Sequence, residues 1–400
     1  MLIEHLTRQL REREAQSLRR TLRVATSPCA PRQRVAQNGA ERPMLAFCSN
    51  DYLGLASHPA LADALSEGVA RWGVGSGASH LINGHSQAHA ELEADLAAWL
   101  GAWIPGAKAL IFGTGYMANL ALLTSLGDAQ TTVFSDKLNH ASLIDGGLLA
   151  RAEVHRYAHG RLDVLDQQLQ RCTTPIRLIV TDAVFSMDGD LADLPALLAL
   201  AERHDAWLIV DDAHGFGVLG PHGHGSLAHW GLHSERFVYM GTLGKAAGIA
   251  GAFVAAHPTI VDWLLQSARG YIYTTAAPPA IAHALRASLR IIGGEEGERR
   301  RAQLRRRIER LRGGLAALIG QRPALGWRLP ESTTAIQPMI VGDNERALAL
   351  AAALDAQGLW VPAIRPPTVP VGTARLRITL SAAHTEDDVE RLLAALAAAS

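Results

Sequence analysis

Segments with two different patterns of apolar and polar residues alternate along most of the chain. From about residue 45, short apolar runs are separated by longer stretches in which apolar residues recur at helical spacing. This alternation is typical of βα units that build a largely parallel sheet flanked by helices. The expected strands are Ala109–Phe112, Thr131–Ser135, Glu153–Tyr157, Arg177–Asp182, Trp207–Asp211, Phe237–Met240 and Gly251–Ala255. Helices are expected between them, such as Ala88–Leu100 and Leu194–His204.

The two ends of the chain differ from this central pattern. Leucines at helical spacing predict a helix over residues 1–24, and Pro28, Pro31 and Gly39 then break it. A long helical region opens at Pro278 and runs through about Ile319. Three parts are therefore expected: an N-terminal helical segment 1–45, a large α/β domain 46–285 and a smaller α+β domain 286–400.

Composition narrows the class of protein. With 48% hydrophobic and 19% charged residues the chain can bury a sizeable core, and 38 acidic residues balance 38 basic ones. Zero net charge argues against a nucleic-acid partner held by electrostatics. Cys29, Cys48 and Cys172 form neither metal-binding spacing nor a disulfide framework, and no run suggests a signal peptide or a membrane span. We expect a cytoplasmic protein without a metal site.

Lysine is rare, and one lysine lies where chemistry is expected. Only Lys108, Lys137 and Lys245 are lysines, and Lys245 follows an apolar run in a loop of small residues, 240–248. An amine nucleophile near the acid and imidazole of segment 210–215 suggests Schiff-base chemistry on a pyridine cofactor. The alternative is a solvated loop lysine.

Polar groups follow consecutive expected strands. In chain order they are the glycine loop around Gly115, then His140, Ser186, Asp211 with His214, and Lys245. In open α/β folds, ligands bind at this edge of the sheet. Taken singly, each group has another interpretation: a tight βα turn for the glycines, a helix cap or core role for His140, and a turn for the Asp-Gly pair after Ser186.

Two further segments carry open alternatives. The glycine-rich stretch Gly73–His80 either closes over a ligand or is a flexible connection. The arginine-rich stretch Glu295–Arg312 is either a phosphate-binding face or a solvated helix in which glutamates pair with arginines four residues on, as Glu295 would with Arg299. We favour the solvated helix, since zero net charge leaves no field to recruit nucleic acid.

The sequence motifs around these residues resemble those of the α-oxoamine synthases, a branch of the pyridoxal 5'-phosphate (PLP) enzymes of fold type I. The resemblance covers nearly the whole chain and rests on Ser49–Leu55, Phe185–Asp190, Asp211–Gly215 and Ile364–Pro370. The chain departs from the family in its glycine-rich loop, with Ala78 where a third glycine is common and His80 where Arg or Gly is common.

The resemblance implies a role for each residue around the cofactor. Lys245 would bind PLP covalently and move the Cα proton, Asp211 would pair with the pyridine nitrogen, and His140 would stack on the ring. The remaining contacts to the cofactor would come from Gly115, Tyr116, Ser186, His214 and Thr242. Thr274 or Thr275 would reach the phosphate of a neighbouring subunit, which implies a homodimer with shared sites.

The resemblance also implies the substrates. Asn50 and Arg377 would hold the amino-acid carboxylate, with His140 against the same substrate, and Arg19 and Thr368 would contact the acyl donor. The run Ile364–Pro370 resembles the branch that condenses L-alanine with a pimeloyl thioester, of coenzyme A or of a carrier protein, in biotin biosynthesis. Glycine-using relatives would share every PLP residue. Outside the family, the pattern leaves open a nucleotide-binding α/β protein without a covalent cofactor.

Overall fold

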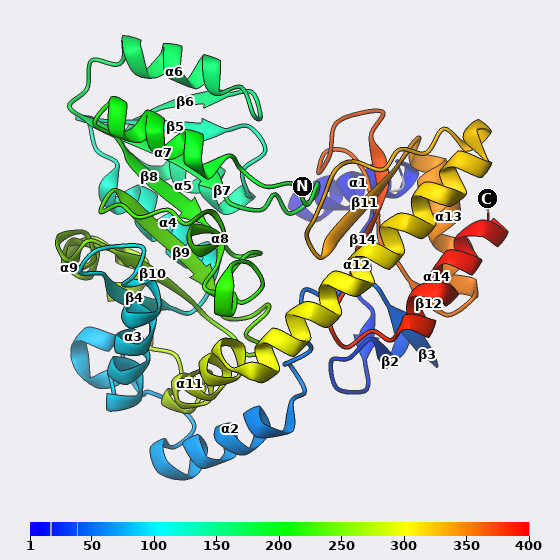
Figure 1. The fold of residues 1–400 in the computed structure, drawn as a ribbon, viewed down its shortest axis with the longest axis horizontal. Coiled ribbons are helices and arrows are strands. Elements are labelled where there is room, and N and C mark those ends of the chain that lie inside the picture. Colours follow the sequence, from blue (N-terminus) through cyan, green and yellow to red (C-terminus); the bar gives the residue numbers. More distant parts are fainter. Residues whose placement is uncertain (17, 38, 400) are drawn as a thin grey trace.

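A seven-stranded sheet forms the centre of the larger part of the molecule (Figure 1). The computed structural model describes residues 1–16, 18–37 and 39–399. In spatial order the strands are β4 (Lys108–Phe112), β10 (Ala252–Ala256), β9 (Phe237–Thr242), β8 (Trp207–Asp211), β7 (Ile176–Asp182), β5 (Thr131–Asp136) and β6 (Glu153–Tyr157). Neighbours are parallel from β9 to β6, whereas β10 runs antiparallel to both β4 and β9. All seven expected strands and the mostly parallel sheet are confirmed, with ends shifted by a residue or two.

Both faces of this sheet are buried. Ile179 and Leu208 belong to one apolar cluster, whereas their chain neighbours Val180 and Ile209 belong to another. Successive side chains of a strand point to opposite faces, so a strand covered on both sides is apolar throughout. The helices of this part are α2 (Pro59–Trp72), α3 (Gln87–Leu100), α4 (Gly115–Leu126), α5 (Ala141–Leu149), α6 (Leu162–Arg171), α7 (Leu194–Arg203), α8 (Ser226–Trp230), α9 (Pro258–Ser267), α10 (Arg269–Ile272) and α11 (Pro279–Gly293).

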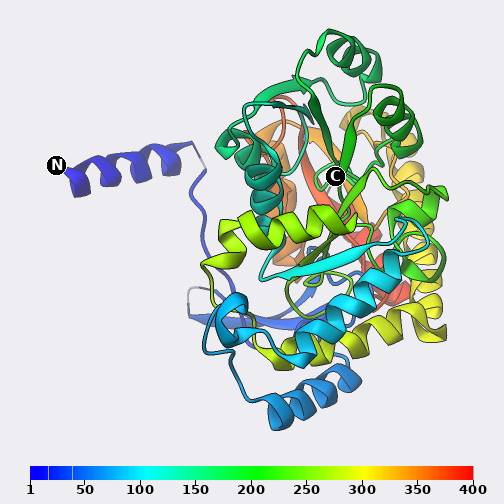
Figure 2. The ribbon, with the colours of Figure 1, turned by 90° about the vertical axis from the view of Figure 1, so that its left-hand side faces the viewer.

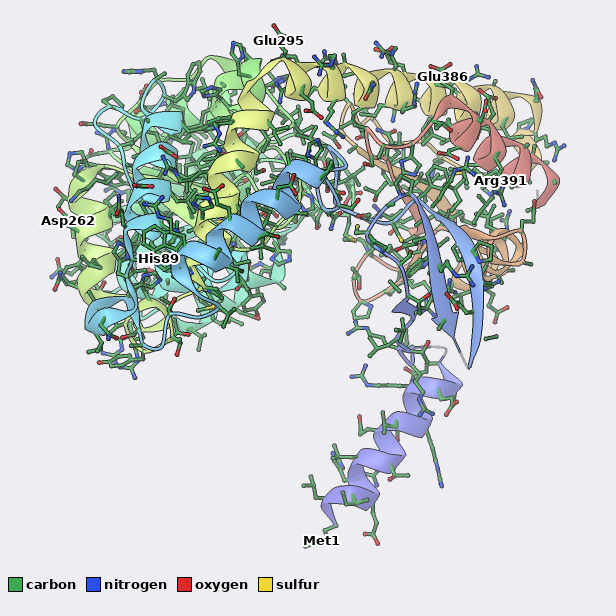
Figure 3. All side chains as sticks on the ribbon, turned by 90° about the horizontal axis from the view of Figure 1, so that it is seen from below. Met1, His89, Asp262, Glu295, Glu386 and Arg391 are labelled. Carbon is green, nitrogen blue, oxygen red and sulfur yellow. The ribbon has the colours of Figure 1, made fainter. Side chains whose placement is uncertain are left out.

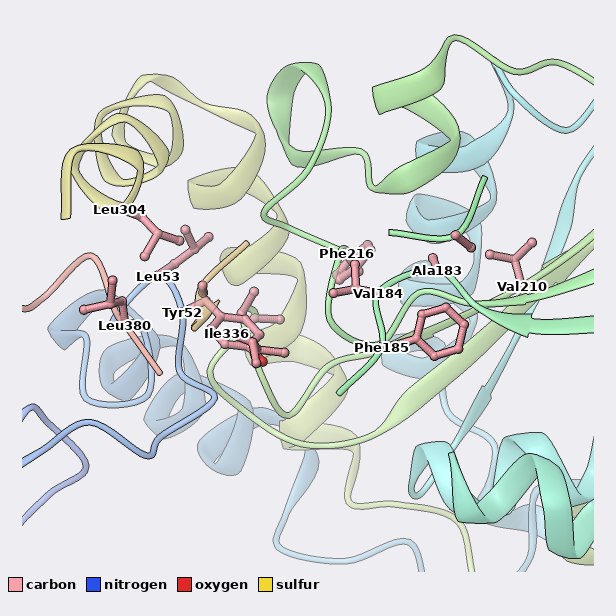
Figure 4. Packing of buried hydrophobic residues seen from close by; sticks show 14 of the residues in the cluster. Tyr52, Leu53, Ala183, Val184, Phe185, Val210, Phe216, Leu304, Ile336 and Leu380 are labelled. Atoms are coloured by element: carbon pink, nitrogen blue, oxygen red, sulfur yellow. The ribbon is translucent and has the colours of Figure 1, made fainter. Parts of the chain in front are cut away.

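The smaller part joins the larger one through a long helix and a shared core. Helix α12 (Glu295–Gln321) runs from one part to the other (Figure 1). Beyond it lie a sheet of β11 (Ile336–Gly342), β14 (Ala374–Thr379) and β13 (Ala363–Ile364) and the helices α13 (Asn344–Ala356) and α14 (Glu386–Ala399). Figure 4 shows Leu304 and Leu380 of the smaller part in the same apolar cluster as Phe185 and Val210.

The expected long helical region is two helices. It breaks at Gly293 and Gly294, so that α11 packs on α2 and α3 while α12 leaves in a new direction. The expected glutamate–arginine pairs of α12 are present, with Arg300 2.7 Å from Glu296. The three-part division of the chain stays a prediction, and its boundary at residue 285 falls inside α11.

The N-terminal segment differs from the expected helix over residues 1–24. Helix α1 (Leu2–Ala15) ends early, buries none of its residues and projects from the body (Figures 2 and 3). The expectation of a helical segment to residue 45 is wrong for its second half, where β1 (Val24–Ala25), β2 (Arg32–Gln37) and β3 (Ala40–Ala46) form a sheet with β12 (Leu359–Trp360). Gly39, at a φ of +81°, lies in the tight turn between β2 and β3. In the described part of the chain, no helix combines the length and hydropathy needed to cross a bilayer.

Candidate active site

A cavity of about 190 Å³ opens at the carboxyl ends of the central strands. Its lining residues are Gly115, Tyr116, Asn119, His140, Ser142, Asp182, Ser186, Asp211, Ala213, His214, Met240, Thr242 and Lys245. Each parallel connection returns the chain to the same sheet edge, so residues distant in sequence meet there. The cavity brings together the sequence-predicted group from Gly115 to Lys245.

Asp211 is the buried carboxylate at the end of β8. Its Oδ2 accepts a hydrogen bond of 2.7 Å from Asn119 Nδ2, and its Oδ1 accepts one of 2.9 Å from the amide of Ala213. Asp182 ends the adjacent strand β7 in register with it. Burial, and then the charge of Asp211, raise the pKa of Asp182 well above its ordinary value. The raised pKa favours the neutral form of Asp182 beside Asp211.

His140 is fixed at the start of α5. Its amide donates to Asp182 Oδ2 at 2.7 Å, and its Nδ1 accepts from the amide of Ser142 at 3.3 Å. Asn119 Nδ2 donates to Ser142 Oγ at 2.9 Å, and this hydroxyl lies 2.7 Å from His140 Nδ1. His140 is thus both a helix cap and a cavity residue. Burial is the main cause that lowers its pKa, which favours the neutral ring.

Lys245 lies in the loop after β9 with its amine against a histidine. Its Nζ is 2.9 Å from His214 Nε2, and His214 Nδ1 is 2.5 Å from the hydroxyl of Tyr52. Burial lowers the pKa of Lys245 to about 8, against the opposing charges of Asp211 and Asp182. Burial also lowers the pKa of His214 well below its ordinary value, so a neutral imidazole can accept from the amine.

Arg377 and Asn50 meet beside this cavity. The guanidinium donates from Nε to the carbonyl of Ser186 at 2.6 Å, from Nη1 to Thr379 Oγ1 at 2.9 Å and from Nη2 to Asn50 Oδ1 at 3.4 Å. Tyr52 also donates to Asn50 Oδ1, at 3.1 Å. The two residues predicted to hold a carboxylate therefore lie together, next to the backbone of a cavity residue.

Besides Asn50 and Arg377, four further predicted residues do not line the cavity. Arg19 is exposed and forms an ion pair of 2.8 Å with Glu14, and Thr368 is exposed in a loop. Thr275 is exposed and bridges to Ser79, and Thr274 is half-buried. Their assigned roles stay predictions.

Sequence reasoning gave no role to Asn119, Ser142, Asp182 and Tyr52, which complete the site. Two of them carried a usable pattern. Asn119 lies one helical turn after Gly115, and Asp182 ends an expected strand just as Asp211 does. Ser142 and Tyr52 become recognisable only through their partners in space.

The residues present fit PLP. The amides at the start of α4 can bind a phosphate, and a Cβ on Gly115 would come within 2.7 Å of Thr242 Cγ2, so only glycine allows this close approach. A buried carboxylate, a histidine and an amine of lowered pKa supply partners for the pyridine nitrogen, the ring face and the aldehyde.

Known proteins share this fold and most of this sequence. The model of the aminotransferase class I and II family matches residues 42–396. An 8-amino-7-oxononanoate synthase of Leptothrix cholodnii is 72% identical over 99% of this chain and 98% of its own length. A serine palmitoyltransferase of S. paucimobilis with bound PLP–myriocin superposes with a TM-score of 0.85 at 30% identity, over 99% of this chain and 96% of that one.

A solved 8-amino-7-oxononanoate synthase of Francisella tularensis is similar too. It has a TM-score of 0.74 and 30% identity, and the match covers 89% of this chain and 97% of that one. These matches also decide against a glycine-using relative and against a protein without a covalent cofactor. The chain belongs to the 8-amino-7-oxononanoate synthases, PLP-dependent acyltransferases of biotin biosynthesis that have the class I and II aminotransferase fold.

Proposed function

We propose that the enzyme condenses L-alanine with a pimeloyl thioester, of coenzyme A or of a carrier protein, to give 8-amino-7-oxononanoate, CO2 and the free thiol. The observation that carries this is the contact of Arg377 with Asn50 beside the cavity of Lys245 and Asp211. Arg377 and Asn50 can bind the carboxylate of an amino acid, and they lie next to the amine of Lys245 and the buried carboxyl group of Asp211. Bound in this cavity, PLP supplies an aldehyde for the amine and a ring that takes up the electron pair of the substrate's Cα.

Lys245 is the residue that moves the proton. With a pKa of about 8, about one tenth of its amine is neutral at pH 7, far more than for an ordinary lysine, and can accept the Cα proton. His214 Nε2, 2.9 Å away, accepts a hydrogen bond from the amine and so aims it into the cavity.

Asp211 and His140 hold the cofactor ring. The carboxylate of Asp211 keeps a proton on the pyridine nitrogen, because a charged acid stabilises the cationic partner. The hydrogen bonds of Asn119 and Ala213 fix both of its oxygens. The imidazole of His140, oriented through Ser142, covers one face of the ring. The fork of Arg377 binds the alanine carboxylate, with Asn50 beside it.

The predicted contacts outside the cavity come from Arg19, Thr368 and either Thr274 or Thr275. We propose a homodimer in which Thr274 or Thr275 reaches the phosphate in the partner's site. Arg19 and Thr368 contact the acyl donor. Their exposure in the single chain is compatible with contacts that form only with a second chain or with substrate.

Direct competition tests the substrates. The purified enzyme is given alanine and glycine together, with pimeloyl-CoA, acetyl-CoA or succinyl-CoA as donor, and the products are separated by mass. We expect alanine with pimeloyl-CoA to be used at least about ten times faster than any glycine pair. Faster use of glycine with acetyl-CoA would refute the substrates proposed.

Arg19→Ala tests the acyl contact. We expect its KM for the pimeloyl donor to rise about tenfold or more while its KM for alanine stays constant, since Arg19 touches one substrate only. Arg20→Ala is the matched control, because Arg20 is the equally exposed neighbour. Equal effects in the two variants would remove Arg19 from the site.

A further inference from the structure

Three histidines gather outside the catalytic cavity. His80 starts the short helical turn η1 (His80–Gly84), and His85 follows it. His89, labelled in Figure 3, lies in α3. Each offers one ring nitrogen, and these nitrogens lie within 4.8 Å of one another. His80 and His89 are buried, whereas His85 is exposed. Two of the three rings are therefore enclosed by other residues, and the third is accessible to solvent.

Each of the three rings has a neighbour that orients it, and His89 has the hydrogen bond typical of a ligating histidine. Nε2 of His89 lies 2.8 Å from the carbonyl of Ala277, and Nε2 of His85 lies 3.8 Å from Glu93 Oε2. Metal-binding histidines commonly donate their second N–H to a carbonyl or carboxylate of this kind. Tyr271 stacks on the His80 ring, with centroids 4.6 Å apart and planes 10° apart. This stacking fixes the plane of the third ring.

The ring nitrogens of His80 and His85 face each other. Nδ1 of His80 lies 3.0 Å from Nδ1 of His85. A tetrahedral zinc ion with bonds of about 2.1 Å keeps its ligand nitrogens about 3.4 Å apart, which lies between this 3.0 Å and the 4.8 Å limit of the cluster.

We propose that His80, His85 and His89 form a binding site for a divalent transition-metal ion of the zinc class. Water completes the coordination on the exposed side of His85. Binding through Nδ1 of His89 replaces the hydrogen bond of 3.0 Å that this atom accepts from the amide of Ser86 and its contact of 3.1 Å with the Ser86 hydroxyl. A bond to a divalent metal is much stronger than the hydrogen bond it replaces.

The site adjoins the segment that carries Thr274 and Thr275. The carbonyl of Ala277 accepts hydrogen bonds from His89 and, at 2.6 Å, from Ser76 Oγ, and the amide of Ala276 donates to Ala78 at 3.0 Å. A metal held by the cluster therefore cross-links the glycine-rich loop, α3 and this segment, and raises the thermal stability of the region. The expectation of no metal site rested on the spacing of the cysteines alone.

Metal titration of the PLP-loaded enzyme tests the site. The enzyme is dialysed against a chelator and titrated with Co²⁺ and with Zn²⁺, followed by visible absorption, calorimetry and Tm. His85→Gln removes an exposed ligand at little risk to folding, and His80→Phe keeps a ring on Tyr271. His155→Gln is the matched control, because His155 also pairs with a glutamate, Glu153, at 2.8 Å but lies outside the cluster.

We expect one equivalent of Co²⁺ per chain, visible bands of nitrogen coordination, and a Tm that rises with Zn²⁺. Affinity should fall about 100-fold or more in His85→Gln and in His80→Phe and stay constant in His155→Gln. Absence of saturable binding in the unmodified enzyme overturns the proposal. So does binding that both cluster variants retain, because the metal would then lie elsewhere.

Discussion

Asp211 acts through its charge, and a change that removes only the charge isolates this role. Asparagine has the same shape, so in Asp211→Asn the cavity persists while the pyridine nitrogen loses its anionic partner. We expect exchange of the alanine Cα proton to slow by about two or more powers of ten, the scale of a lost electrostatic contact. The exchange is followed by NMR in D2O, with circular dichroism as the check of folding. An unchanged exchange rate would show that Asp211 is only structural.

Lys245 gives the site a pH dependence of known direction. Burial lowers the pKa of its amine to about 8, so about one tenth of the amine is neutral at pH 7 and about half at pH 8. Only the neutral amine attacks an aldehyde. Covalent attachment of PLP to the apoprotein should therefore speed up about fivefold from pH 7 to pH 8 and level off above pH 9.

Rapid-mixing absorbance measures this attachment, and borohydride reduction with peptide mapping identifies the lysine. Lys245→Ala should show no covalent attachment and no measurable turnover. Attachment at Lys108 or Lys137, or a rate that still climbs steeply above pH 9, would contradict the assignment.

At the level of single residues, the sequence predicts the site residues that follow strands and misses the residues that hydrogen-bond to them. Asp211 and Lys245 could be predicted because parallel strands end at one edge of the sheet. The spacing of Asn119 from Gly115 places it on the cavity side of α4, but nothing in the helix shows that its side-chain amide will meet a carboxylate 92 residues away. Supporting contacts depend on how α4 and α5 pack on the sheet, and a single sequence does not encode that packing in any local pattern.

At the scale of single elements, the packing of helix α12 depends on one buried arginine. Arg301 is 1% exposed and donates to the carbonyls of Gly217, at 3.1 Å, and Ile292, at 2.9 Å. Arg301→Met leaves both carbonyls without this donor, and we expect the free energy of unfolding to fall by about 2–4 kcal/mol. Arg299→Met, at an exposed position of the same helix, should change it by less than about 0.5 kcal/mol. Urea unfolding of both variants gives the comparison, and equal losses would refute the role of Arg301.

The periodic pattern predicts helices and strands better than it predicts what these elements contact. The strands β8 and β9 were predictable because two buried faces leave a nearly continuous apolar run in each of them. The same reasoning treats every leucine on a helix as a contact, yet Leu6 and Leu10 of α1 are exposed. The strands of residues 24–46 were missed although β1, β2 and β3 pair with one another locally, and only the pairing of β3 with β12 depends on the distant C-terminal part of the chain.

The whole molecule should be a dimer if Thr274 or Thr275 completes a partner's site. Light scattering of the PLP-loaded enzyme should then give twice the chain mass of 42.8 kDa. Thr275→Val should weaken PLP binding without changing this mass, because it removes only a hydroxyl. A fully active monomer would contradict the shared site.

The projecting helix α1 makes the enzyme a good subject for limited proteolysis. Trypsin cuts after arginine, and Arg8, Arg11, Arg13, Arg19 and Arg20 are all exposed. Because α1 buries no residue, a cut there disrupts no core, and the body should survive as a shortened protein. A product cut after Arg19 or Arg20, just beyond α1, would keep the whole cofactor cavity and lose Arg19. A single protease cut would thus separate cofactor binding from affinity for the acyl donor, and resistance to the cut would indicate that another chain covers α1.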